Sequence, residues 1–263
     1  MKLFWILFAV AAGTEAAAPE GWTPALRRVL AQPGVQWVLV DASSRRTIDI
    51  QWKERETPAP FGSLIKPFTA LAYGASHGHR FPQFECPGRE ACWAPRGHGR
   101  IGLEEAIAFS CNSWFRQLAA GLEAGQTETV LERFGLRPPV LFSAVSTLAG
   151  YGDSWRFSVE AMAGAYCELM ERRMEPTVSR IVRGMRMAAA RGTAAGLGIA
   201  ALAKTGTAPC LHRPGAAADG YVVAVLDRTA PPVVLLVQVH GATGAEAAAI
   251  AGRALRRLKL GER

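Results

Sequence analysis

The sequence predicts an α+β fold, in which an antiparallel sheet flanked by helices is joined to a second, all-helical lobe. Strand-like segments occur near both ends of the chain, as a hairpin over 35–52 and as three strands after residue 198. The middle of the chain has helical periodicity instead. Because few parallel crossovers separate the strands, the two ends of the chain are expected to build one sheet together.

Length and composition are those of a folded protein. The 263 residues can bury a full core, as one domain or as two lobes that share an interface. Hydrophobic content of 49% and charged content of 20% exclude a disordered chain. The net charge of +8 favours anionic surroundings, but the basic residues are scattered and lack interleaved aromatics, so we expect no nucleic-acid partner.

The first 18 residues have the pattern of a secretory signal peptide. Lys2 precedes an apolar run over 3–12, small residues follow at 16–18, and Pro19 stops any continuation. A membrane anchor is the alternative, but the run is well short of the ~20 residues that a span needs, so cleavage is favoured. Residues 19–263 are then expected to form one exported domain, in the periplasm or on the outer face of the cell envelope.

The elements after the signal are expected in the following order. A helix over 23–31 has Thr23 as its cap, and it is followed by strands over 35–41 and 47–52. A Pro/Gly-rich loop then leads into a helix that begins near Ser63. Helices are expected at 103–109, 113–122, 127–134, 158–170 and 176–190, strands at 199–204, 220–226 and 233–239, and an amphipathic helix at 245–258.

Three short motifs can carry chemistry. Ser63-Leu64-Ile65-Lys66 places a hydroxyl and an amine three residues apart, which on a helical turn sets a nucleophile beside its base. Ser110-Cys111-Asn112 stands where a helix is expected to break, and Lys204-Thr205-Gly206 follows a strand. Each motif alone also fits a structural role, since the first two resemble helix caps and the third a strand that runs into a turn.

In this order, S-x-x-K, S-x-N and K-T-G form a signature, and the chain resembles the transpeptidase domain of penicillin-binding proteins. It is also similar to the serine β-lactamases that share that fold. The segments 61–71, 106–115 and 203–208 extend the likeness beyond the triplets, and it covers roughly residues 35–258.

The resemblance implies a reaction at Ser63, which would attack the carbonyl of a D-Ala-D-Ala peptide or the amide of a β-lactam. Lys66 would accept the proton of Ser63, which an arginine could not do because it does not deprotonate in proteins. Ser110 would pass a proton to the leaving group.

Substrate binding is implied for the remaining motif residues. Asn112 would hold the amide of the substrate, and Lys204 and Thr205 would attract its carboxylate. Gly206 would let a ligand approach the strand edge. The backbone N–H groups of Ser63 and Thr207 would form the oxyanion hole.

The resemblance thus implies a serine DD-peptidase without a cofactor. Its partners would be the peptidoglycan stem peptide, β-lactams and, in the envelope, membrane-associated cell-wall proteins. A class D-like β-lactamase and a non-turnover sensor are the alternatives. Class D enzymes carry an apolar residue where Asn112 stands, and the Glu-x-x-x-Asn of class A is missing because Asn112 is the only asparagine.

Export to an oxidising compartment would allow the cysteines to form disulfides. Cys86 and Cys92 flank a short loop and are expected to form a disulfide. A metal site that adds His98 is the alternative, disfavoured because there is no paired Cys-x-x-Cys. The other cysteines (Cys111, Cys167 and Cys210) are odd in number, so at least one thiol should be free or intermolecular.

Overall fold

The computed structural model describes residues 19–137, 145–211 and 215–258. The predicted signal peptide, residues 1–18, lies outside this part of the chain. Within it, no helix is both long enough and apolar enough to cross a membrane.

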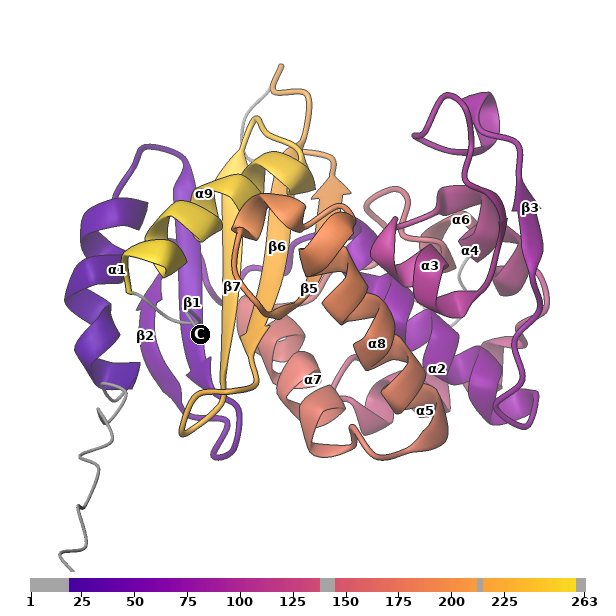
Figure 1. Ribbon diagram of the computed structural model, residues 1–263, viewed down its shortest axis with the longest axis horizontal. Coiled ribbons are helices and arrows are strands. Elements are labelled where there is room, and N and C mark those ends of the chain that lie inside the picture. Colours follow the sequence, from indigo (N-terminus) through magenta and orange to yellow (C-terminus); the bar gives the residue numbers. More distant parts are fainter. Residues whose placement is uncertain (1–18, 138–144, 212–214, 259–263) are drawn as a thin grey trace, which may run out of the picture.

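One five-stranded antiparallel sheet is built from both ends of the chain, as the sequence predicts (Figure 1). Its order is β2-β1-β7-β6-β5, and each strand is antiparallel to its neighbours. Leu39 pairs with Leu235 where the N-terminal hairpin meets the C-terminal strands. The strands are β1 (Val35–Asp41), β2 (Thr47–Gln51), β5 (Leu202–Ala208), β6 (Asp219–Leu226) and β7 (Val233–His240).

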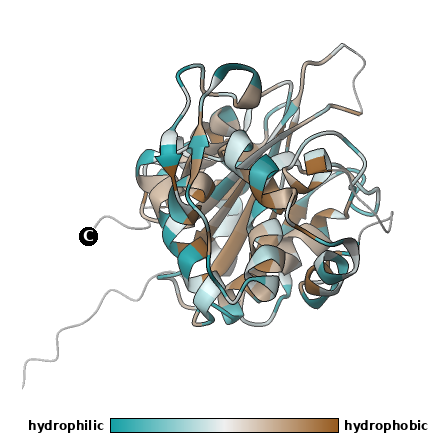
Figure 2. Ribbon diagram, turned by 90° about the vertical axis from the view of Figure 1, so that its right-hand side faces the viewer, coloured by the Kyte–Doolittle hydropathy of each residue, from teal (hydrophilic) through white to brown (hydrophobic). Residues whose placement is uncertain are grey.

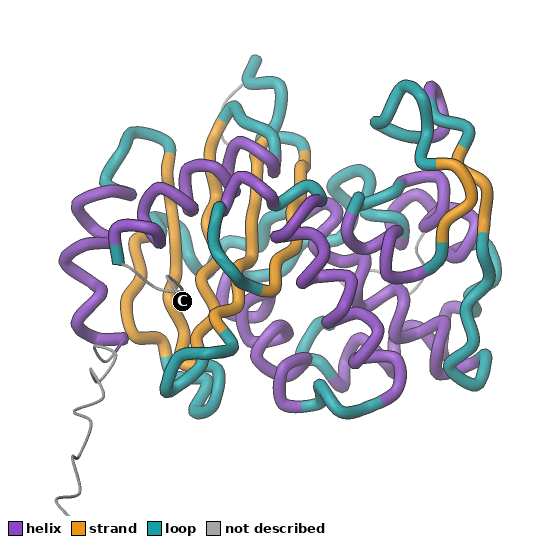
Figure 3. Tube along the Cα trace, in the orientation of Figure 1, coloured by secondary structure: helices purple, strands orange, loops and turns teal. Residues whose placement is uncertain are grey.

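Helices cover both faces of the sheet because alternate strand residues bury toward opposite sides (Figure 3). Leu39 and Val237 pack in a core with α1 (Thr23–Leu30) and α9 (Gly244–Arg257). Val38 and Leu236 face the larger core that the sheet shares with the helical lobe. In Figure 2 the strands in the middle of the molecule are mostly brown, which marks them as hydrophobic.

The helical lobe occupies the other half of the molecule (Figure 1). Its helices are α2 (Lys66–Ser76), α3 (Leu103–Ala108), α4 (Asn112–Ala119), α5 (Ala124–Arg133), α6 (Val145–Leu148), α7 (Val159–Glu171) and α8 (Pro176–Arg191). A small hairpin of β3 (Phe84–Cys86) and β4 (Gly99–Ile101) lies at its edge, and the sequence did not predict it.

Three local expectations differ from the structure. The N-cap of α1 is Trp22, and Thr23, expected to be the cap, is the first residue of the helix. The segment at Ser63 begins as a single 3₁₀ turn, Gly62–Ile65, and the α-helix starts only at Lys66. The Lys204-Thr205-Gly206 motif lies inside β5 rather than at a strand end, because pairing with β6 continues to Ala208. Since β5 is at the edge of the sheet, no strand of the described residues lies on one side of this motif.

Candidate active site

The 3₁₀ turn Gly62–Ile65 holds Ser63 against the edge strand β5. We call it the nucleophile turn because Ser63 is the candidate nucleophile. Gly62 has a φ of +53°, and a Cβ there would lie 2.2 Å from the carbonyl oxygen of Thr207. Only glycine permits both this backbone conformation and this close approach. On the other side, the buried Tyr166 hydroxyl donates a 2.9 Å hydrogen bond to the carbonyl of Leu64. The backbone around Ser63 is therefore fixed by two neighbouring elements.

Ser63 lines a cavity of about 830 Å³ together with residues of the other two motifs. The walls come from the 3₁₀ turn at Ser63, the loop before β4, the break between α3 and α4, the segment after α6, strand β5, the turn after α8 and the start of α9. The lining residues are Ser63, Trp93, Ser110, Asn112, Gly150, Tyr151, Gly192, Thr193, Gly196, Thr205, Gly206, Thr207, Thr243, Gly244 and Ala245. The three motifs predicted from the sequence thus meet at one cavity.

Lys66 is fully buried, and its amine is held by the second motif. Lys66 Nζ donates to the carbonyl oxygen of Ser110 at 2.8 Å and to Asn112 Oδ1 at 2.7 Å, and it lies 3.4 Å from Ser110 Oγ. Burial lowers the pKa of the Lys66 amine to about 7, so a large share is neutral near neutral pH. A neutral amine has two hydrogens, which the two closest oxygens can accept, and its lone pair stays available as a base.

Ser110 lies at the helix break in a left-handed conformation, with a φ of +50°. Such a backbone is uncommon for a residue other than glycine and is found disproportionately at functional sites. It directs the hydroxyl to Lys204, whose Nζ donates to Ser110 Oγ at 2.7 Å. Ser110 Oγ is therefore within reach of both motif lysines.

Lys204 is also fully buried, and it also donates to the carbonyl of Thr205 at 2.8 Å. Burial, and then the positive charge of Lys66, lower the pKa of Lys204 well below its usual range. Two ammonium groups around one hydroxyl repel each other, so each lysine favours the neutral form of the other.

The third motif presents a row of hydroxyl groups. Thr205 Oγ1 donates a 2.6 Å hydrogen bond to Thr193 Oγ1, and Thr207 Oγ1 accepts one from the backbone N–H of Gly244 at 3.0 Å. Gly206 lies against the nucleophile turn, since a Cβ there would be 2.3 Å from the carbonyl oxygen of Phe61. Thr193 was not predicted as a site residue, because it follows α8 in an irregular turn that has no recognisable motif.

Gly150 is a second residue that sequence reasoning missed. It has a φ of +83°, and a Cβ there would lie 2.8 Å from the Cα of Ser63. Its neighbour Tyr151 lines the cavity, and burial raises the pKa of Tyr151 to about 12, which keeps the phenol protonated. This segment therefore packs directly on the nucleophile turn.

One predicted contact is not made in the structure. Within the described ranges, no hydrogen bond joins the Ser63 hydroxyl to the Lys66 amine, which instead contacts Ser110 and Asn112. Catalytic hydrogen bonds are often long or misaligned without substrate. Ser63 lines the same cavity as Ser110 and Asn112, the two residues that hold the Lys66 amine.

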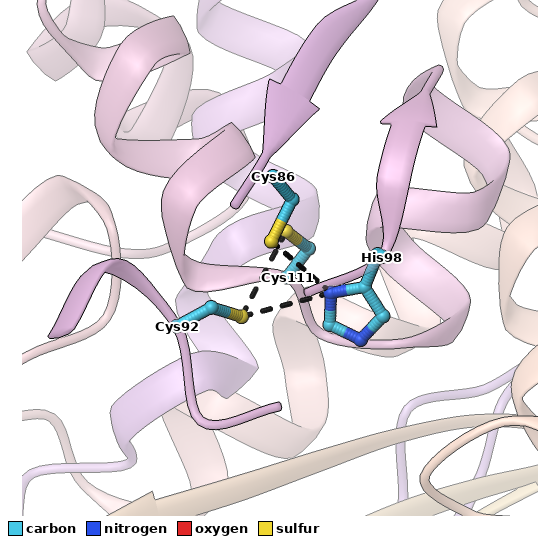
Figure 4. Close-up of side chains that lie close together, drawn as sticks. All are labelled: Cys86, Cys92, His98 and Cys111. Carbon is cyan, nitrogen blue, oxygen red and sulfur yellow. Dashed lines mark hydrogen bonds between the residues drawn. The ribbon is translucent and has the colours of Figure 1, made fainter. Parts of the chain in front are cut away.

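The predicted disulfide between Cys86 and Cys92 is not formed, and both thiols are free. The two cysteines converge instead with His98 and Cys111 (Figure 4). The metal site weighed from the sequence as the alternative already grouped Cys86, Cys92 and His98. Cys111 was missed because the start of α4, and not the sequence spacing, brings it close to them.

Comparisons with solved structures place this fold among transpeptidase domains. Pseudomonas aeruginosa PBP2, in complex with WCK 5153, matches with a TM-score of 0.73 at 17% identity, over 90% of this chain and 73% of that one. The TP domain of Burkholderia pseudomallei penicillin-binding protein 3 matches with a TM-score of 0.70 at 16% identity, over 91% of each chain. The Helicobacter pylori complex of PBP2 and MreC matches with a TM-score of 0.73 at 14% identity, over 91% of this chain and 62% of that one.

No family model and no curated protein matches this chain. The likeness to solved structures therefore shows the fold: an α+β transpeptidase fold of the kind found in penicillin-binding proteins.

Proposed function

We propose that this protein is an acyl-serine DD-peptidase that acts on peptidoglycan stem peptides, as a transpeptidase or carboxypeptidase, and that β-lactams acylate it. The observation that carries the proposal is that Ser63 and Ser110 line one cavity in a transpeptidase fold, with the buried amines of Lys66 and Lys204 both at Ser110 Oγ.

The first half-reaction is acyl transfer to Ser63. Ser63 Oγ attacks the carbonyl of the terminal D-Ala-D-Ala bond, and the neutral Lys66 amine takes the hydroxyl proton. The backbone N–H groups of Ser63 and Thr207 receive the oxyanion, in keeping with the close approach of their two segments. Collapse of the tetrahedral intermediate breaks the C–N bond and leaves an ester on Ser63. The departing amine takes a proton through Ser110.

Substrate is held along the edge strand. Because β5 is the edge strand of the sheet that the structure describes, an extended peptide can pair with its backbone. The terminal carboxylate would lie at Thr205 and Thr207, near the Lys204 amine, and its arrival would favour the protonated form of that amine. Asn112, whose oxygen already accepts from Lys66, would offer its NH₂ group to the substrate amide.

The second half-reaction, the attack of water or of an acceptor amine on the ester, separates peptidase from β-lactamase. The Lys66 amine makes hydrogen bonds to polar groups on two sides, which is unlike the apolar pocket that a modified lysine of a class D-like enzyme needs. The polar surroundings of Lys66 therefore favour a peptidase, in which the β-lactam ester is long-lived, over a β-lactamase. A sensor that merely holds peptidoglycan would need neither the proton relay nor a buried base, whereas a non-turnover sensor that a β-lactam acylates once would need both.

Location and partners complete the proposal. The signal-like residues 1–18 support export to the periplasm or the outer face of the envelope. The complex of Helicobacter pylori PBP2 with MreC supports a membrane-associated cell-wall partner for this chain too.

The test is the release of D-alanine from a pentapeptide that ends in D-Ala-D-Ala, followed by mass spectrometry with and without an acceptor amine. We expect D-alanine release that benzylpenicillin abolishes and that Ser63→Ala loses while its thermal unfolding stays cooperative. A folded Ser63→Ala protein that still releases D-alanine would refute the assignment.

A further inference from the structure

Four potential metal ligands from separate parts of the chain meet beside the active site. Cys86 ends β3, Cys92 follows the 3₁₀ turn Arg89–Ala91, His98 precedes β4, and Cys111 is the N-cap of α4. Figure 4 shows the three sulfur atoms and the imidazole turned toward a common point. Their ligand atoms all lie within 4.8 Å of one another.

The separations are those of ligands around one tetrahedral ion. His98 Nδ1 lies 3.5 Å from Cys86 Sγ and 3.6 Å from Cys92 Sγ, and the sulfurs of Cys92 and Cys111 are 3.9 Å apart. Zinc bonds of about 2.3 Å to sulfur and about 2.0 Å to nitrogen give tetrahedral edges of about 3.8 Å between sulfurs and about 3.5 Å between sulfur and nitrogen. A disulfide would instead bring two sulfurs to about 2.05 Å.

The surroundings hold these groups in place. All three cysteines are buried, and the backbone N–H of Trp114 points at Cys111 Sγ from 3.5 Å. The His98 ring stacks on Phe109 at an interplanar angle of 8°. Backbone donors to sulfur and a fixed imidazole orientation are the outer-shell contacts that metal sites use.

Two glycines close the loop that carries the ligands. Gly88 and Gly97 both have positive φ, and a Cβ at Gly88 would lie 2.2 Å from the nitrogen of Gly97. A Cβ at Gly97 would lie 2.0 Å from the carbonyl oxygen of Cys86. This close backbone approach brings the two ends of the loop, and with them Cys86 and His98, to the same place.

We propose that Cys86, Cys92, His98 and Cys111 form a Cys₃His centre for Zn²⁺. Three thiolates with one imidazole is a closed structural zinc set, and soft sulfur ligands disfavour Mg²⁺ and Ca²⁺. A resident zinc ion also protects the three thiols from oxidation in an exported protein.

The zinc centre would also act on the active site, and this part rests on the proposed function. Cys111 stands between Ser110 and Asn112, the two residues that hold the Lys66 amine. Coordination of Cys111 would tie this helix break to the β3–β4 hairpin and keep Ser110 in its left-handed conformation. The metal would then act as a positioning device and would not touch substrate.

Metal content of the purified protein tests the centre itself. We expect about one zinc ion per chain, and a cobalt(II)-substituted protein with the visible bands of a tetrahedral site and sulfur-to-cobalt charge transfer. Cys92→Ser should lose most of the metal. Cys167→Ser should keep the metal. It makes the same change at a buried free cysteine of α7 that lies outside the cluster.

Two results would overturn the proposal. One is a disulfide between any two of the cluster cysteines, found by mass mapping of the unreduced protein. The other is native protein that takes up neither zinc nor cobalt. Both results are measured on the native chain. The proposal can therefore be tested even when the Cys92→Ser variant does not fold.

Acylation by a fluorescent penicillin then tests the coupling. Removal of zinc by a chelator should slow labelling at least ~10-fold, as expected when a catalytic group shifts by about an ångström, and returning zinc should restore it. Unchanged labelling of demonstrably zinc-free protein would overturn the positioning role of the metal. The proposal that the four residues bind zinc would still stand. Native, zinc-loaded protein that never labels would instead count against the proposed function.

Discussion

Lys204 Nζ donates a 2.7 Å hydrogen bond to Ser110 Oγ, so the hydroxyl proton of Ser110 points away from Lys204. The second lysine, Lys66, lies 3.4 Å from the same oxygen. Ser110 therefore connects the two buried amines. In the proposed reaction its proton would move to a leaving group in the cavity, and we expect Ser110 and Lys204 to act as one unit.

A double-mutant cycle tests that unit. We expect Ser110→Ala and Lys204→Ala each to slow acylation by penicillin by about 10² or more. Because residues that act together are not additive, Ser110→Ala should have a much smaller effect in the Lys204→Ala background. The measurement is the second-order labelling rate of all four proteins. If the fold-decrease in the double mutant equals the product of the two single-mutant decreases, the two residues act independently.

The pH dependence of acylation follows from Lys66. Burial disfavours the ammonium form and lowers the pKa of Lys66 to about 7, and only the neutral amine can accept the Ser63 proton. The acylation rate should therefore rise with pH and level off above about pH 8. The check is the labelling rate across this range, with unfolding followed in parallel. A rate that is flat or falls as pH rises through 7 would contradict a neutral Lys66 base.

Lys66→Arg separates charge from basicity. It keeps a cation but removes the proton acceptor, since a guanidinium does not deprotonate in proteins. We expect its acylation rate to fall by about 10² or more, as far as in Lys66→Ala. Recovery of most of the rate by arginine would make Lys66 an electrostatic residue only.

Gly150→Ala probes the packing on the nucleophile, and Gly152→Ala is its matched control. Both glycines have positive φ, at +83° and +75°, so both substitutions strain the backbone by about 1 kcal/mol or more. A Cβ at Gly150 would meet the Cα of Ser63 at 2.8 Å, whereas one at Gly152 would meet nothing within 4 Å.

Gly152→Ala should lose stability through backbone strain alone, and Gly150→Ala should lose more because its Cβ also clashes with the backbone of Ser63. Measured on folded protein, only Gly150→Ala should slow acylation, by at least about 10-fold. Equal acylation rates in the two folded variants would show that the contact with Ser63 has no catalytic importance.

Much of the fold and of the site could be predicted because the signals are local. The hairpin of β1 and β2, the helix α8 and the S-x-x-K motif each lie in one continuous segment with clear periodicity or spacing. The β3–β4 hairpin was missed because strands of three residues are too short for a recognisable pattern.

Other features depend on tertiary approach. Thr193 becomes a site residue only because the turn after α8 meets β5, and Gly150 only because its segment crosses the nucleophile turn. The disulfide prediction was wrong for the same reason. The six-residue spacing from Cys86 to Cys92 carries no sign that Cys111, nineteen residues beyond Cys92, packs against the same pair.

The decisive measurement for an acyl-serine mechanism is the mass of the intact protein during incubation with benzylpenicillin. We expect a stoichiometric adduct that peptide mapping places on Ser63, that persists for minutes or longer, and that is missing in folded Ser63→Ala. An adduct on another residue would contradict the acyl-serine mechanism at Ser63. Sustained penicillin hydrolysis at roughly 1 s⁻¹ or faster, the low end of ordinary enzyme turnover, would contradict the peptidase and indicate a β-lactamase.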